Sequence, residues 1–189
     1  MLPILVELQR LKRLDRTGWV LRGLANGTES VASHSFGVAI TSMLLADEIR
    51  WRGGVIDAER VLRMALIHDW AESRVGDMPR TGSVYFGTDA RKQAEAAAFA
   101  DIVSTAANSA EYRSLHDEYE DRKTLESQLV KAADVIDLLL QTLALERAGA
   151  KGLDEFWDVT KDANVGLPGV AGEIVSEVLQ SLLDARQRI

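Results

Sequence analysis

Apolar residues recur along this chain at three- and four-residue spacing, which is the pattern of amphipathic helices, and no segment alternates convincingly as a strand would. Only three prolines occur in a sequence rich in Ala, Leu, Glu and Arg, which favours helix throughout. The pattern therefore predicts an all-α fold. The expected helices cover about 31–51, 57–74, 89–108, 110–121, 124–147, 153–160 and 170–188.

The segment 77–88 (DMPRTGSVYFGT) is predicted to be a loop, because Gly76 and Pro79 end the preceding helix. It is long for a connection between two helices, and loops of that length often carry function. Neither an internal repeat nor a low-complexity linker divides the chain. We therefore expect residues 1–189 to form a single domain.

Composition narrows the class of protein. The 189 residues are 47% hydrophobic and 27% charged, as in an ordinary globular protein. No apolar run is long enough for a membrane span, and the N-terminal residues resemble no signal peptide, so we expect a cytoplasmic protein. The absence of cysteine excludes disulfides and thiolate metal sites. The net charge of −7 argues against nucleic-acid binding, and an anionic substrate would need positive charge from a metal or from placed arginines.

Polar side chains interrupt the apolar faces of three predicted helices. His34 lies on the apolar stripe of the first, His68 and Asp69 follow the apolar face of the second, and Asp134 lies at the edge of a buried face. A buried carboxylate needs a metal, a cation or a hydrogen-bond network. Together, two histidines and two aspartates supply one N2O2 ligand set. Such a set suits one divalent ion such as Mn, Co, Ni, Fe or Zn.

Each of these residues also has an ordinary structural explanation. A single histidine on an apolar stripe is more often a hydrogen-bonded core residue than a ligand, and this applies to His34. Asp134 could instead pair with Lys131 or Arg147. The only other histidine, His116, lies in a charged stretch and is expected at the surface, which favours a single metal ion.

The order of these motifs resembles the HD-domain phosphohydrolase superfamily. His34 lies in ESVASHS, the His68-Asp69 pair lies in ALIHDWAE followed by VGDMP, and Asp134 ends LVKAAD. Over roughly residues 5–148 these segments are similar to the 5′-deoxynucleotidase branch. The resemblance implies an all-α HD-type bundle of about six to eight helices, with C-terminal helices in 153–189 packing on it. It also implies a homodimer that hydrolyses deoxynucleoside 5′-monophosphates with a divalent cation.

The resemblance implies roles for particular residues. His34, His68, Asp69 and Asp134 correspond to the metal ligands, and Glu72 to the acid/base carboxylate. Without the resemblance, Glu72 could form a salt bridge to Arg74 or Lys131. The segment Asp77-Met78-Pro79-Arg80 corresponds to a nucleotide-binding loop, in which Asp77 contacts the substrate. An ordinary turn aspartate is the alternative for Asp77.

Near the N-terminus the family commonly places an Arg-Trp pair, whereas this chain reads Arg16-Thr-Gly-Trp19. Either Arg16 or Arg22 is therefore expected to bind the phosphate. Trp19 either lines the sugar pocket or packs as a hydrophobic staple for the first helix.

Two other functions fit the same residues. One is a different HD hydrolase activity, on nucleoside triphosphates, cyclic nucleotides or alarmones, although the short chain lacks room for the regulatory domains that many such enzymes carry. The other is a nucleotide-binding protein without turnover. Glu72 argues against it, because a binding site needs no acid/base group beside the metal.

Overall fold

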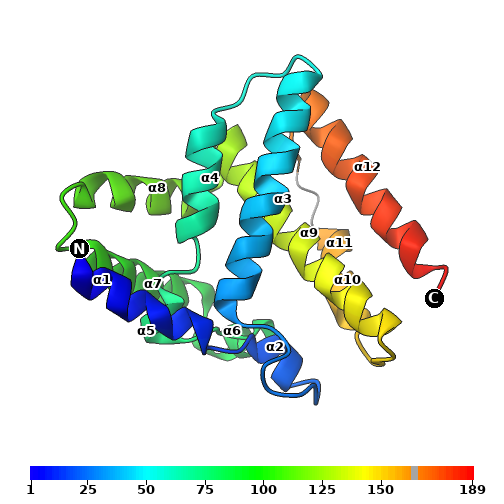
Figure 1. The fold of residues 1–189 in the computed structure, drawn as a ribbon, viewed down its shortest axis with the longest axis horizontal. Coiled ribbons are helices and arrows are strands. Elements are labelled where there is room, and N and C mark those ends of the chain that lie inside the picture. The colour runs from blue at the N-terminus through cyan, green and yellow to red at the C-terminus, as the bar shows by residue number, and fades with distance from the viewer. Residues whose placement is uncertain (163–165) are drawn as a thin grey trace. The chain divides into compact units, whose positions relative to one another are not determined.

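The computed structural model describes residues 1–162 and 166–189, except for the side chains of Arg80, Ser83, Val84, Lys161 and Asp162. Helices form the regular structure of this part of the chain, with one isolated bridge between Asp15 and Ser30, so the all-α prediction is confirmed (Figure 1). The helices are α1 (Leu2–Glu7), η1 (Leu8–Lys12), α2 (Thr17–Val20), α3 (Val31–Trp51), α4 (Ala58–Ile67), α5 (Glu72–Val75), α6 (Arg80–Phe86), α7 (Thr88–Val103), α8 (Ser109–Asp121), α9 (Leu125–Arg147), α10 (Asp154–Trp157), α11 (Val159–Asp162) and α12 (Gly169–Arg186).

Several helix ends follow from local capping chemistry. The α3 helix has the predicted bounds, and the Ser30 hydroxyl at its start accepts a hydrogen bond from the Ser33 N–H at 3.1 Å. Thr124 caps α9 in the same way, accepting from the Ser127 N–H at 3.2 Å. Such a cap stabilises a helix by about 1 kcal/mol.

Three predicted boundaries are wrong, one of them being the end of the 89–108 helix, since α7 ends at Val103. The helix expected to run to residue 74 ends at Ile67, and a turn at 68–71 precedes α5. In that turn the N–H groups of Trp70 and Glu72 bond three residues back, which tightens the backbone. The segment 77–88 is also not all loop, because α6 occupies most of it. Pro79 stands directly before α6, a position that favours a helix start, and Gly87 at φ 83° ends it.

The described residues group into two compact units, and the chain passes between them within α3, within α4 and at the end of α8. The first unit contains residues 1–36 and 66–120. Here α5 and α6 pack on α7, and α1 and η1 pack beside them.

The second unit contains residues 37–65 and 121–189, and in it α10 and α12 pack on the long helix α9. Its helices also approach closely where Gly37 of α3 meets the Asp137 carboxylate of α9. A Cβ at position 37 would force that carboxylate to shift, so glycine suits this close approach.

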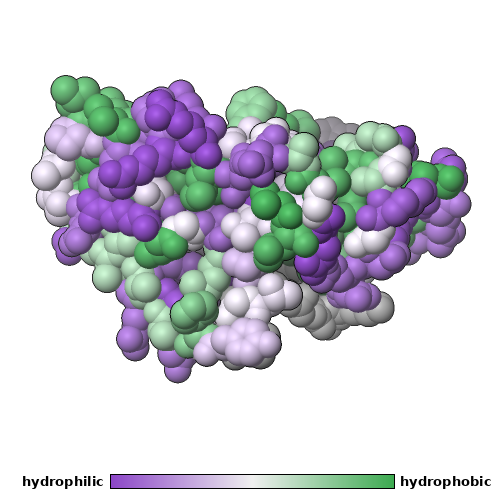
Figure 2. Space-filling view, turned by 90° about the horizontal axis from the view of Figure 1, so that it is seen from below, coloured by the Kyte–Doolittle hydropathy of each residue, from purple (hydrophilic) through white to green (hydrophobic). Residues whose placement is uncertain are grey.

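Large apolar side chains fill each unit, and others stay exposed. Trp19, Phe99 and Leu115 are buried in the first unit, and Met64, Leu129 and Leu139 in the second. On the face drawn in Figure 2, hydrophobic residues lie among hydrophilic ones. No helix in the described part of the chain is long and apolar enough to cross a membrane.

His116 is buried, and the prediction that it lies at the surface is wrong. Its side chain is 3% exposed, and its ring stacks on Phe99 with centroids 4.2 Å apart. The charged residues around it in the sequence lie on the other faces of α8, as Asp117 does at 74% exposure of its side chain. Burial lowers the pKa of His116, although Glu120 and Asp117 act in the opposite direction.

This burial predicts a pH-dependent contribution to stability. The unfolded chain has the ordinary imidazole pKa of 6.5, whereas the folded value is lower, so the unfolded state binds more protons as the pH falls below about 6.5. The folded protein therefore loses stability as the pH falls from about 6.5 toward the folded pKa, by at most about 1.4 kcal/mol per pH unit from this group. The measurement is denaturant unfolding of the wild type and His116→Phe between pH 7.5 and 5.5.

His116→Phe keeps a ring against Phe99 but cannot titrate. The stability difference between the two proteins should move in favour of the variant as the pH falls, and a difference that stays constant would contradict the assignment.

Candidate metal centre and active site

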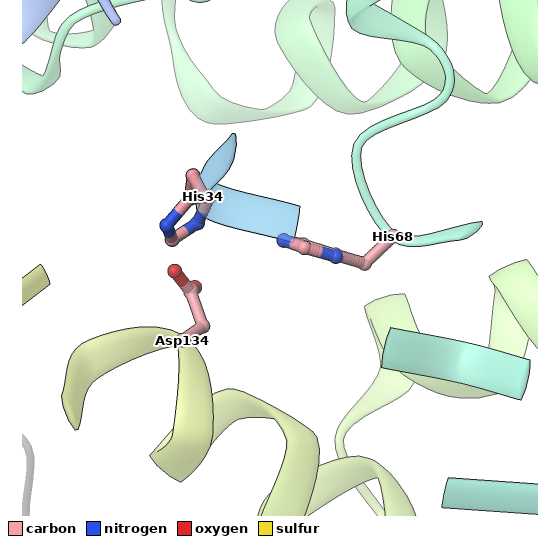
Figure 3. A group of neighbouring side chains, drawn as sticks. All are labelled: His34, His68 and Asp134. Atoms are coloured by element: carbon pink, nitrogen blue, oxygen red, sulfur yellow. The ribbon is translucent and has the colours of Figure 1, made fainter. Parts of the chain in front are cut away.

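Two buried histidines of the first unit face one another. His34 lies in the first turn of α3, where its backbone N–H donates to the Ser30 carbonyl, and His68 opens the turn after α4. Both side chains are 1% exposed. One donor nitrogen of each lies within 4.8 Å of the other, and the ring centroids are 5.6 Å apart. Figure 3 draws the two rings, together with Asp134 of α9.

Asp69 joins the two histidines. Its Oδ2 atom lies 3.1 Å from His68 Nε2 and 3.8 Å from His34 Nε2. Burial would raise the pKa of Asp69, but His68, His34 and Arg16 outweigh it and hold the pKa below its usual range. Two imidazole nitrogens and an ionised carboxylate therefore converge. This donor set fits a borderline divalent cation. The turn after α4 contains both His68 and Asp69 and brings their side chains to the same site.

Asp134 belongs to the second unit. It lies on α9, partly buried, and accepts a hydrogen bond from Lys131 Nζ at 2.6 Å. The pairing with Lys131 that the sequence left open is thus present. It shows one way in which the carboxylate charge is compensated.

Glu72 begins α5, beside the cluster formed by His34, His68 and Asp69. Burial raises the pKa of Glu72 well above its ordinary value, and Asp69 and Asp77 add to the effect while Arg16 opposes it. Among the described residues, its Oε2 atom is buried and has no hydrogen-bond partner. A carboxyl group whose pKa is raised in this way holds a proton more readily than an exposed one, which suits an acid/base group.

The salt bridges considered for Glu72 involve other carboxylates instead. Arg74 binds Glu7, with Nε 2.6 Å from Oε1, and also Asp101 at 3.1 Å. The Lys131 amine binds Asp134. Arg74 and Lys131 are thus paired with other carboxylates, and the cation that acts on Glu72 is Arg16.

Arg16 is the arginine that faces this cluster. Its guanidinium lies 3.7 Å from Asp69 Oδ2 through Nη1 and 3.7 Å from Asp77 Oδ2 through Nε. Arg22 lies in the turn after α2, partly exposed. Of the two candidates, the ion pair with Asp69 favours Arg16.

Trp19 and the 77–80 segment complete the predicted set. The Trp19 ring is 1% exposed, and its Nε1–H donates to Glu29 at 2.6 Å, so the ring belongs to the core of the first unit. Met78 and Pro79 lie, partly buried, between Gly76 and α6. Arg80 begins α6, and its side chain lies outside the described residues.

Sequence reasoning missed three contacts near this cluster. Thr17 bonds Asp77, Glu29 bonds Trp19, and the Tyr119 ring meets the His68 ring edge-on at 5.6 Å. Each contact joins residues from separate segments of the chain, so no single motif indicated the pairing. The Tyr119 contact had one signal, since its three-residue spacing from His116 places both on one face of α8.

These features define a class of protein: an all-helical one in which a histidine pair and an adjacent aspartate form a buried site with a protonatable glutamate. The family model of the HD domain matches residues 8–165, and the chain belongs to this family.

Named relatives and solved structures agree with this assignment. The 5′-deoxynucleotidase YGK1 of Saccharomyces cerevisiae is 31% identical over 98% of this chain and 83% of its own length. The human 5′-deoxynucleotidase HDDC2 is 31% identical over 80% of this chain and 72% of its own. The crystal structure of the PH0347 protein from Pyrococcus horikoshii is 34% identical, with a TM-score of 0.83, and covers 98% of this chain and 99% of its own.

Proposed function

We propose that this HD-domain protein is a metal-dependent phosphohydrolase that releases phosphate from deoxynucleoside 5′-monophosphates. The observation that carries the proposal is the buried cluster of His34, His68 and Asp69 beside Glu72, whose pKa burial raises. The activity named for the yeast and human relatives supports the substrate class.

A single divalent ion would be held by His34, His68 and Asp69, and the resemblance adds Asp134 as the fourth ligand. When bound, such an ion supplies positive charge for phosphate oxygens and makes a coordinated water more acidic. Binding through Asp134 would compete with its bond to Lys131. Co, Mn, Ni, Fe and Zn all suit nitrogen and oxygen donors, and we propose an ion from this group.

The side chains around the ion would divide the remaining work. Arg16, held between Asp69 and Asp77, would bind a phosphate oxygen and offset the negative charge of the site. Glu72 would hold a proton for the leaving 5′-oxygen, or take one from the attacking water. The nucleoside would lie along Met78, Pro79 and Arg80, with Asp77 near the sugar.

Phosphate release from a nucleotide panel tests the function. We expect deoxynucleoside 5′-monophosphates to be hydrolysed faster than ribonucleotides by about ten- to a hundredfold, the range that one buried sugar contact gives. The panel should include triphosphates and cyclic nucleotides, each with Mn, Co, Ni, Zn and a chelator. Cleavage of the triphosphates or cyclic nucleotides alone would identify a different HD activity. No release with any metal would favour the binding-only alternative.

We also propose that residues 1–189 act as one domain, because the HD match at 8–165 includes residues of both units. A cytoplasmic homodimer is the corresponding proposal for the assembly. Apolar side chains on α1, among them Leu2, Leu5 and Val6, are exposed and available to a second copy. Light scattering would test it against the 20.8 kDa of one chain.

A further inference from the structure

Thr17 holds Asp77 through two separate hydrogen bonds. Its backbone N–H donates to Asp77 Oδ2 at 2.5 Å, and its hydroxyl donates to the Asp77 carbonyl oxygen at 2.7 Å. The two residues are 60 positions apart in the sequence. Gly76, at φ 81°, lets the chain turn immediately before Asp77, a conformation that side chains disfavour.

Asp77 is also one of the groups that hold Arg16 in place. Its backbone is fixed by a bond from its N–H to the Glu29 carbonyl at 2.9 Å. Its guanidinium is oriented by Asp77 Oδ2 and Asp69 Oδ2, each at 3.7 Å. An arginine side chain loses considerable rotamer freedom when it binds an anion. A carboxylate that is itself held in place restricts the arginine beforehand, so less of this freedom is lost on binding.

We propose that Thr17 is a positioning residue for phosphate binding. Its two hydrogen bonds to Asp77 fix the carboxylate that holds Arg16 in place beside Asp69. This inference rests on the proposed function in one respect, namely that Arg16 binds the phosphate. It also changes the role expected of Asp77. Its Oδ2 accepts from the Thr17 N–H and faces the Arg16 guanidinium, so Asp77 acts first as an anchor within the protein and only second as a contact to the sugar.

The test is the affinity of the metal-loaded full chain for inorganic phosphate, measured by calorimetry, alongside steady-state kinetics. Thr17→Val keeps the shape and the N–H bond but loses the hydroxyl bond. We expect the phosphate Kd and the KM to rise about five- to thirtyfold, the effect of losing one buried hydrogen bond, while kcat changes less. Thr17→Ser should restore both.

Arg16→Gln separates positioning from general structure. If Thr17 acts through Arg16, adding Thr17→Val to Arg16→Gln should weaken phosphate binding by less than about twofold further. Equal weakening in both backgrounds, or no effect of Thr17→Val in the wild type, overturns the proposal. Thr28→Val is the matched control, because Thr28 makes a similar bond to the Ala25 carbonyl at 2.6 Å away from Asp77.

Asp77→Asn covers the case in which Thr17→Val does not fold. It retains an acceptor for the Thr17 N–H but loses the charge facing Arg16, so the same non-additivity with Arg16→Gln is expected, and additive effects overturn the proposal. A wild type that binds phosphate with this coupling but hydrolyses no deoxynucleotide contradicts the proposed function alone.

Discussion

Replacing Asp69 with alanine is expected to abolish phosphate release and to lower the bound metal to well below one ion per chain. Asp69 Oδ2 lies within 3.8 Å of both His34 Nε2 and His68 Nε2, so its removal takes away a carboxylate that lies beside both rings. A four-ligand site that loses one ligand loses its geometry and much of its affinity. Elemental analysis after gel filtration measures the metal, and phosphate release measures the activity.

His68→Ala should behave in the same way, because it removes a nitrogen donor from the same group. Asp117→Ala is the control, since it removes an exposed carboxylate of the same unit and should change neither quantity. Circular dichroism verifies that each variant is folded. Full metal occupancy in a folded Asp69→Ala protein would remove Asp69 from the ligand set.

Local sequence signals were sufficient to predict most of the helices. The α3 helix has the predicted ends because its signals are local, with a Ser30 cap at one end and Gly53 just beyond the other. The end of α4 was not predictable in this way, because the 57–74 segment has helical propensity throughout. There the backbone tightens into a turn through bonds three residues back, which helical propensity does not predict, and the turn contains both His68 and Asp69.

The candidate site was predictable only where a motif marked it. Neighbours in the sequence identified His68, Asp69 and Glu72 as one group, and the structure places them together. The Thr17–Asp77 pair spans 60 residues and joins two separate segments that no motif links, so only the tertiary structure reveals it. His116 shows the opposite error. Its charged neighbours suggested exposure, but on a helix they occupy different faces.

Glu72→Gln is expected to slow turnover by about 10²–10⁴-fold, the usual range for an acid/base group, without loss of metal. Glutamine keeps the size of the side chain but neither gains nor loses a proton in the required range. The raised pKa of Glu72, caused by burial and by Asp69 and Asp77, is that of a carboxyl group able to protonate a leaving oxygen. Single-turnover phosphate release and metal content are the measurements.

Glu120→Gln provides the comparison for this variant. Glu120 is a partly buried carboxylate of the same unit that pairs with Lys92 at 3.5 Å, so its replacement should leave turnover within about twofold of the wild type. The metal content decides between two roles for Glu72. If Glu72→Gln loses activity and retains metal, Glu72 transfers a proton. If the metal leaves together with the activity, Glu72 is itself a ligand, since its buried Oε2 has no hydrogen-bond partner among the described residues and would be available to an ion.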